Sequence, residues 1–179
     1  MAAATGATVL VAGVEPAIGV AIALSLVDHV RSGYRPRNSV IARGQDGHAR
    51  LLPVATPAQY APGLLVYRFS HSMYYANSDV LASELIAVSS AADPPLRWLV
   101  LDMDAVDDVD FSAGATLASL RKILAEQGVA MKFLRVSQPV MESLRSYGLL
   151  PADHAGDGLP FTSIRDMRHS FESSQTTAP

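Results

Sequence analysis

The sequence predicts an α/β domain with a mixed, mostly parallel sheet flanked by helices, preceded by an apolar N-terminal helix. Short apolar runs typical of buried strands alternate with segments of helical periodicity about ten residues long. The chain has 179 residues, of which 49% are hydrophobic and 17% charged, and this suits one domain with a sizeable core. Residues 1–27 contain Glu15 as their only charged residue, which sets the N-terminal segment apart.

The first predicted element is an apolar, transmembrane-like segment over residues 1–35. Its run TVLVAGVEPAIGVAIALSLV, starting at Thr8, has about the length that crosses a bilayer core. A buried helix of a water-soluble domain is the alternative, because Glu15-Pro16 divides the run into two shorter pieces. Four arginines follow the apolar run, at Arg31, Arg35, Arg37 and Arg43. Under the positive-inside rule, they predict a membrane protein whose main domain lies on the cytoplasmic side.

Three regions follow the apolar segment. Residues 36–63 are rich in Pro, Gly and polar residues, and predict a linker with an edge strand. Residues 64–171 contain the alternating strand and helix signals of the main domain. Residues 172–179, ESSQTTAP, predict a disordered tail.

Three apolar runs predict the strands of the main domain: LLVYRF at Leu64–Phe69, RWLVLDM at Arg97–Met103 and VAMKFLRV at Val129–Val136. The second run has the pattern of a strand buried on both faces. The strands are short and their connections tight, so the domain is smaller than a dinucleotide-binding fold. The chain also lacks the GxGxxG and GxxxxGK[ST] patterns, which argues against nicotinamide and P-loop chemistry.

The predicted helices begin at residues whose side chains commonly cap helix N-termini. These residues are Asn77, Ser78 or Asp79, then Ser112, then Ser137, and finally Thr162 or Ser163. Gly128 and Gly148 mark the expected ends of the second and third helices, because glycine readily adopts the left-handed conformation found there.

The most polar segment is LDMDAVDDVDFSAG, which contains Asp102, Asp104, Asp107, Asp108 and Asp110. It follows a buried strand, at the sheet edge where open α/β domains bind ligands. Its spacing does not fit a calcium-binding EF-hand. The pair Asp102 and Asp104 resembles the first motif of haloacid-dehalogenase-like phosphatases, in which one aspartate attacks phosphorus and the other is the acid/base. The other interpretation is a solvated turn before a helix.

Composition excludes several classes of function. The net charge of −3 gives no basic face for nucleic acid. The absence of cysteine removes thiolate metal sites and cysteine nucleophiles. His71, His154 and His169 show no ligand spacing. We therefore predict no nucleic-acid binding, metal, cofactor or catalytic residue.

Several segments together resemble a known family. The segments LLVYRFSHSMYYANSDVL, WLVLDMDAVDDVDFSAGATLASL, GVAMKFLRV and SLRSYGLL resemble, in this order, those of the STAS domain that ends SulP-type sulfate/anion transporters. The opening apolar run followed by RPRNSVIARG looks like that family's last membrane segment and connector. The YRF and YYAN block is the most specific part of the resemblance.

STAS domains are similar to anti-sigma-factor antagonists, and this likeness implies a regulatory site. Their phosphoacceptor Ser lies two residues after an Asp, which identifies Ser112 and Asp110 here. Phe111 and Ala113 depart from the family pattern, in which Ser or Thr and then Gly are common, and Gly114 comes one residue late. The resemblance also implies a recognition loop, made of Asp102, Asp104, Asp107, Asp108 and Gly114.

The expected function is a non-catalytic regulatory and interaction module of a sulfate/anion transporter. The implied partners are the membrane, the remaining membrane domain of a transporter or a second copy, a regulatory protein and a nucleotide. The chain has room for little more than one membrane span, so we expect no transport by it alone. The alternatives are a soluble antagonist-like STAS protein switched by Ser112 and, third, the Asp-x-Asp phosphatase.

Overall fold

The computed structural model describes residues 6, 13–34, 38–44, 46–56, 58–152 and 158–176. The chain divides into two compact units, Met1–Arg35 and Pro36–Pro179.

The N-terminal unit contains helix α2, which spans Val14–Tyr34. Pro16 lies in its first turn, where a missing N–H breaks no helical hydrogen bond, so the proline does not divide the helix as its sequence position suggested. Among the described residues, no helix combines the length and apolar character that crossing a membrane requires. The expected transmembrane helix is therefore not confirmed, and residues 8–12 of that run lie outside the described part of the chain.

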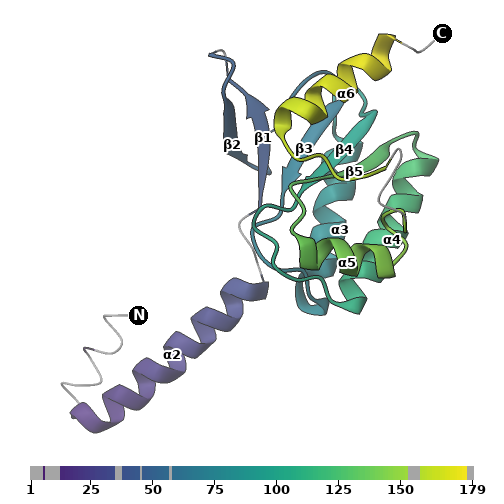
Figure 1. Ribbon diagram of the computed structural model, residues 1–179. Helices are drawn as coiled ribbons and strands as arrows, with labels where there is room; N and C mark the ends of the chain where they lie inside the picture. The colour runs from purple at the N-terminus through teal and green to yellow at the C-terminus, as the bar shows by residue number, and fades with distance from the viewer. Residues whose placement is uncertain are drawn as a thin grey trace. The chain divides into compact units, whose positions relative to one another are not determined.

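The C-terminal unit contains a five-stranded mixed sheet with the order β2-β1-β3-β4-β5 (Figure 1). Its strands are β1 Ser39–Arg43, β2 Ala49–Pro53, β3 Leu64–Arg68, β4 Trp98–Asp102 and β5 Ala130–Leu134. Strands β3, β4 and β5 are parallel, whereas β1 is antiparallel to both of its neighbours. The predicted sheet is therefore confirmed.

Residues 36–63 contain the expected edge strand, which is β2, but they differ from the linker that their composition predicted. They contain both β1 and β2, and β1 is an interior strand because it pairs with β2 on one side and β3 on the other. Val40 and Ile41 of β1 are buried, one on each face of the sheet. This segment is thus part of the same compact unit as the predicted domain at 64–171.

Helices cover both faces of the sheet, as Figure 1 shows. They are α3 Tyr75–Ser90, α4 Phe111–Glu126, α5 Gln138–Ser146 and α6 Ile164–Thr176. The larger hydrophobic cluster joins α3, α4 and α5 to one face, where Tyr67 and Leu101 are buried. The smaller cluster joins α6 to the other face, through Met167 and Phe171 packed against Val100. The burial of β4 on both faces was expected and is confirmed.

Two predicted helix starts need correction. The first residue of α3 is Tyr75, with Tyr74 as the N-cap, so Asn77 lies inside the first turn. From there, the Asn77 Oδ1 accepts a hydrogen bond from the Tyr74 N–H at 2.9 Å. Helix α4 begins at Phe111, and its N-cap is Asp110 instead of Ser112. In both helices a neighbouring residue with a suitable backbone conformation takes the cap position.

The other helix ends follow the sequence more closely. Ser137 is the N-cap of α5, as expected. Gly128 and Gly148 follow α4 and α5 with φ of +75° and +70°, the conformation that glycine adopts without strain. Helix α6 continues to Thr176, so residues 172–176 are helical and do not belong to a disordered tail; residues 177–179 lie outside the described chain.

Candidate functional site

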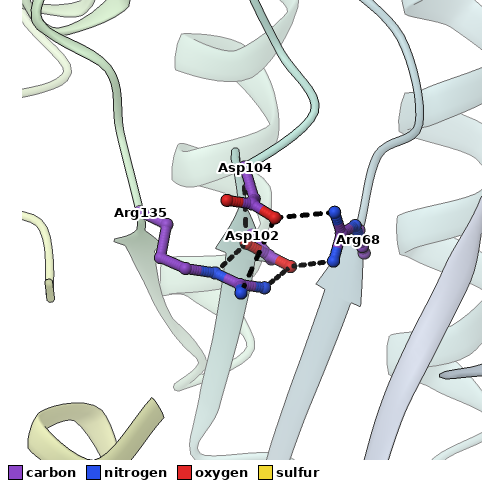
Figure 2. Close-up of polar contacts among 4 residues, drawn as sticks. All are labelled: Arg68, Asp102, Asp104 and Arg135. Atoms are coloured by element: carbon purple, nitrogen blue, oxygen red, sulfur yellow. Dashed lines mark hydrogen bonds and ion pairs between the residues drawn. The ribbon is translucent and has the colours of Figure 1, made fainter. Parts of the chain in front are cut away.

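The candidate site is formed by the residues that end or follow the three parallel strands. Arg68 is the last residue of β3 and pairs directly with Asp102, the last residue of β4. Arg135 follows the last residue of β5, and Asp104 lies two residues beyond β4. Parallel strands bring these carboxyl ends to one sheet edge, where Figure 2 shows the four side chains converging.

These four residues form an ion network with two positive and two negative charges. Asp102 is fully buried, and its Oδ1 accepts a hydrogen bond from Arg135 Nε at 2.9 Å. Its Oδ2 accepts a second bond from Arg135 Nη2 and lies 3.8 Å from Arg68 Nη1. Asp104 Oδ2 lies 2.7 Å from Arg68 Nη2 and 3.6 Å from Arg135 Nη1. Each arginine therefore contacts both aspartates (Figure 2).

Arg135 is held firmly in its charged form within this network. Burial acts to lower its pKa, but the hydrogen bond and charge of Asp102 and the charge of Asp104 outweigh burial, so the pKa is raised. Its backbone adopts a φ of +54°, which is uncommon for a side chain of this size. The Arg135 N–H also donates to the Phe161 carbonyl at 2.8 Å, so backbone and side chain both fix its position.

The ion network argues against the phosphatase interpretation of Asp102. A nucleophilic carboxylate has to reach the phosphorus atom of a substrate. Asp102 has no exposed surface, and both of its oxygens accept hydrogen bonds from Arg135. Its carboxylate therefore acts as a structural anion that joins β3, β4 and the end of β5.

Asp110 holds the starts of two helices with one carboxylate. Its Oδ1 accepts a hydrogen bond from the Ala113 N–H of α4 at 2.8 Å, and its Oδ2 accepts one from the Tyr75 N–H of α3 at 2.9 Å. The Asp110 N–H in turn donates to the Met73 carbonyl at 2.9 Å. A carboxylate at these two positive helix ends is favourable electrostatically as well as through its hydrogen bonds.

Ser112 is the second residue of α4 and is half-buried. Phe111 beside it has 75% of its surface exposed, and Asp107 and Asp108 are exposed in the preceding loop. We call Asp107, Asp108, Phe111 and Ser112 the loop surface. It brings together two acids, an exposed aromatic ring and the predicted phosphoacceptor.

Gly114 has a packing role. It is buried in the first turn of α4, and a Cβ atom built there would overlap the ring of Tyr147. The Tyr147 hydroxyl donates to the Val109 carbonyl at 3.2 Å, and its ring makes an edge contact with Phe111 at 6.1 Å between centroids. The absence of a side chain at Gly114 therefore leaves room for the ring of Tyr147, which follows α5 and packs against Phe111 of the loop surface.

Comparison with models of known protein families identifies the family of this chain. A model described as the STAS domain matches residues 55–156, which is more than half of the chain. The chain belongs to the STAS domain family.

Curated relatives of this STAS protein are described as sulfate transporters. A probable sulfate transporter of Mycobacterium tuberculosis is 31% identical over 173 residues, which cover 96% of this chain and 30% of the relative. High affinity sulfate transporter 2 of Stylosanthes hamata is 24% identical over 168 residues, which cover 88% of this chain and 25% of the relative. The chain thus spans about a third or less of the length of these relatives. The predicted resemblance to STAS domains of sulfate transporters is confirmed.

Solved structures share the fold of this STAS protein. The murine Solute Carrier 26 family member A9 anion transporter, in its inward-facing state, matches with a TM-score of 0.70 and 19% identity, over 94% of this chain and 27% of the transporter. A sulfate transporter family protein from Wolinella succinogenes matches with a TM-score of 0.52 and 17% identity, over 63% of this chain and 87% of that protein. At these identities the likeness establishes the fold.

Sequence reasoning identified the acids of this STAS domain but missed Arg68 and Arg135. Each of these arginines comes at the end of an apolar strand run, LLVYR and AMKFLR, and that shared position is the signal that could have found them. Asp102 and Asp104 bind these arginines, whereas Asp107 and Asp108 stay on the loop surface.

Proposed function

We propose that this chain is a non-catalytic regulatory module of a SulP-type sulfate/anion transporter, with its STAS domain on the cytoplasmic side of the membrane. The proposal rests on the share of this chain that the match to the Mycobacterium tuberculosis relative covers. That match covers 96% of this chain, so it includes both the α2 unit and the STAS domain. Because it covers 30% of the relative, we assign no transport to this chain alone.

The proposed partner is the membrane domain of a transporter, contacted through the loop surface. Exposed aromatic rings contribute strongly to protein interfaces, and Phe111 is exposed beside the acids Asp107 and Asp108. The network behind the loop and the double cap at Asp110 give this surface a fixed backbone. A second copy of the chain, a regulatory protein and a nucleotide are the other partners to be compared in the same assay.

Co-purification tests this proposal. We expect the full chain to co-purify with the separately expressed membrane domain of the Mycobacterium tuberculosis relative. Phe111→Ala should weaken the association, whereas Leu51→Ala, at an exposed apolar residue on β2, is the matched control and should not. If the chain does not associate, or if both variants weaken the association equally, the loop surface is not the contact.

The α2 unit is proposed to attach the chain to the membrane. Apolar residues recur every four positions along α2, at Val14, Ile18, Ile22 and Leu26, and each of these residues is more than half exposed. Residues at this spacing lie on one helix face, so they form an apolar stripe. A stripe of this kind can enter a lipid surface or pack against membrane helices.

Flotation with liposomes tests the attachment. The full chain should rise with the vesicles, and Ile22→Lys should release it. Val27→Lys introduces the same charge at an exposed apolar residue on the opposite face of α2 and should remain bound. If neither variant is released, or if the unaltered chain is absent from the vesicle fraction, α2 does not attach the chain to the membrane.

An antagonist-like function is the second candidate, and the position of Ser112 favours it. Ser112 lies in the first turn of α4, near the helix amides that bind phosphate well, yet it is two residues from the Asp110 carboxylate. A phosphate there would compete with Asp110 and change the loop surface. Under this function, Ser112→Glu should alter binding of a regulatory protein, while Ser119→Glu on an exposed part of α4 should leave it unchanged.

A further inference from the structure

A cavity of about 730 Å³ lies on the α3 side of the sheet, away from the loop surface. Its floor includes Val40 of β1 and Leu65 of β3. One wall comes from α3, including Ala87 and Val88, and the other comes from the connection between β2 and β3, residues 54–56 and 58–62. We call this space the α3 cavity. Its size is within the range of about 300–1,000 Å³ that small-molecule sites occupy.

The lining of the α3 cavity is mostly apolar and carries only negative charge. Glu84 and Asp93 are the charged side chains among its described lining residues, and no Lys, Arg or His is part of that lining. Glu84 is half-buried in the middle of α3, whereas Asp93 is exposed beyond the end of the helix. A ligand bound here therefore meets hydrocarbon and carboxylate oxygens.

Two buried polar side chains hold Glu84 in place. Its Oε2 accepts hydrogen bonds from the Tyr67 hydroxyl and, at 2.9 Å, from Asn38 Nδ2. Tyr67 is fully buried and Asn38 is 8% exposed. Burial, together with the hydrogen bond and charge of Glu84, strongly raises the pKa of Tyr67, so its hydroxyl remains a neutral donor. The carboxylate of Glu84 is thus positioned before any ligand arrives.

The second oxygen of Glu84 is available for a ligand. Both hydrogen bonds fall on Oε2, and in the part of the chain that the structure describes Oε1 accepts none. No cation pairs with Glu84 among these residues either, in contrast to the two aspartates of the ion network. A partly desolvated carboxylate with one unused oxygen favours a donor that carries positive charge.

The rim of the α3 cavity is also fixed by hydrogen bonds. Gln59 Nε2 donates to the Pro94 carbonyl at 2.6 Å, and Gln59 Oε1 accepts from the Gly63 N–H at 2.6 Å. These bonds join the connection before β3 to the turn after α3. The walls of the cavity are therefore held together without a ligand.

We propose that the α3 cavity binds a small ligand with an apolar body and a protonated amine, whose nitrogen pairs with Oε1 of Glu84. The apolar lining removes the hydrocarbon body from water, and the carboxylate selects the charge of the head group. The same two acids repel phosphate and sulfate, so nucleotides and the transported type of anion do not suit this cavity. This site is separate from the loop surface and does not depend on the proposed transporter partner.

A series of probes with one chain length and three head groups tests the proposal. The full chain is titrated with octylammonium and octanoate below their micelle concentrations and with octanol below its solubility limit. Binding is followed by calorimetry and by the amide NMR signals of residues 84–92. Octylammonium should bind at least about tenfold more tightly than octanol, corresponding to about 1.4 kcal/mol, and octanoate should bind most weakly. Equal affinities, tighter binding of octanoate, or no saturable binding would overturn the proposal.

Three variants locate the binding. Glu84→Gln keeps an acceptor for Tyr67 and Asn38 but removes the charge, so it should lower the affinity for octylammonium to that of octanol. Val88→Phe fills the cavity and should abolish binding of octylammonium and octanol. Ser83→Phe places the same ring at an exposed position of α3 outside the lining, and should bind like the unaltered chain. Thermal unfolding of each variant shows that it is folded; an unchanged octylammonium affinity in folded Glu84→Gln would exclude Glu84 as the anchor.

Discussion

Tyr67 and Arg68 are neighbours at the end of β3, yet they belong to two polar clusters that differ in their charge balance. Successive side chains of a strand point to opposite faces of the sheet, so the side chains of Tyr67 and Arg68 point away from each other. Arg68 joins the ion network with Asp102, Asp104 and Arg135. Tyr67 joins Glu84 on the α3 side of the sheet, in a cluster with no cation among the described residues.

The difference between the clusters is one of charge balance. In the ion network, two arginines compensate two aspartates, and Asp102 can be fully buried. In the Tyr67 cluster, hydrogen bonds hold Glu84, but no cation among the described residues compensates its charge, and Glu84 is only half-buried beside the α3 cavity. Burying an uncompensated charge is unfavourable. The balanced cluster can therefore be buried, whereas the unbalanced one leaves a carboxylate oxygen that can accept a hydrogen bond from a ligand.

The strongest test of this contrast is Asp102→Asn. The variant keeps the shape of the side chain but leaves Arg68 and Arg135 with Asp104 as their remaining partner in the network. Because one partner of a buried ion pair is lost, the free energy of unfolding should fall by about 3–5 kcal/mol. Urea denaturation measures the change. A loss below about 1 kcal/mol is what a solvent-exposed ion pair would give, and it would contradict the burial of the network.

Tyr67→Phe is the corresponding change in the unbalanced cluster. It removes a hydrogen bond to the Glu84 carboxylate without changing the packing of the ring, so the free energy of unfolding should fall by about 1.5–3 kcal/mol. The double variant Tyr67→Phe with Glu84→Gln should recover part of this loss, because no charged group is then left short of a donor. Additive losses in urea denaturation would show that the two side chains do not interact.

Asp110 is a third type of acid, because backbone N–H groups compensate it. Asp110→Ala should cost about 0.5–2 kcal/mol of unfolding free energy, as expected for a lost helix cap. Ser112→Ala is the matched change two residues later, and it should cost less because Ser112 is not the cap. Thermal unfolding compares the two variants. A larger loss for Ser112→Ala would indicate that Ser112, and not Asp110, is the N-cap of α4.

Asp104→Asn gives the smallest expected change. The side chain of Asp104 is 42% exposed, and solvent screens its ion pairs with Arg68 and Arg135. The loss should be about 0–1 kcal/mol and should shrink further as salt is added. Urea denaturation at low and high salt measures both effects, and a large, salt-independent loss would show that the network is more deeply buried than its exposure indicates.

Local sequence patterns predicted the parallel strands, because a short continuous apolar run such as that of β4 is typical of a strand buried on both faces of a sheet. They failed at β1, whose interior position depends on pairing with β3 across the long connection at 44–63. They also placed the α4 cap at Ser112, since Asp110 and Ser112 are equally good capping residues in isolation. What decides between them is the contact of Asp110 with Tyr75, which no local pattern contains.

The candidate site was predictable in its acids and not in its arginines. Arg68 and Arg135 are distant in sequence, and the parallel register of β3, β4 and β5 is what brings them to Asp102. Glu84 was missed for a similar reason, because its partners Asn38 and Tyr67 come from a different part of the chain. The family resemblance directed attention to the loop, whereas the α3 cavity has no sequence motif.

The shared carboxylate of Asp110 also has a kinetic consequence. The amides of Tyr75 and Ala113 begin different helices, yet each is protected from solvent by an oxygen of the same side chain. Rotation of that one side chain exposes both amides together. Hydrogen exchange at α3 and α4 should therefore begin with a common opening event at their first turns, so that the two helices respond to their surroundings as a pair.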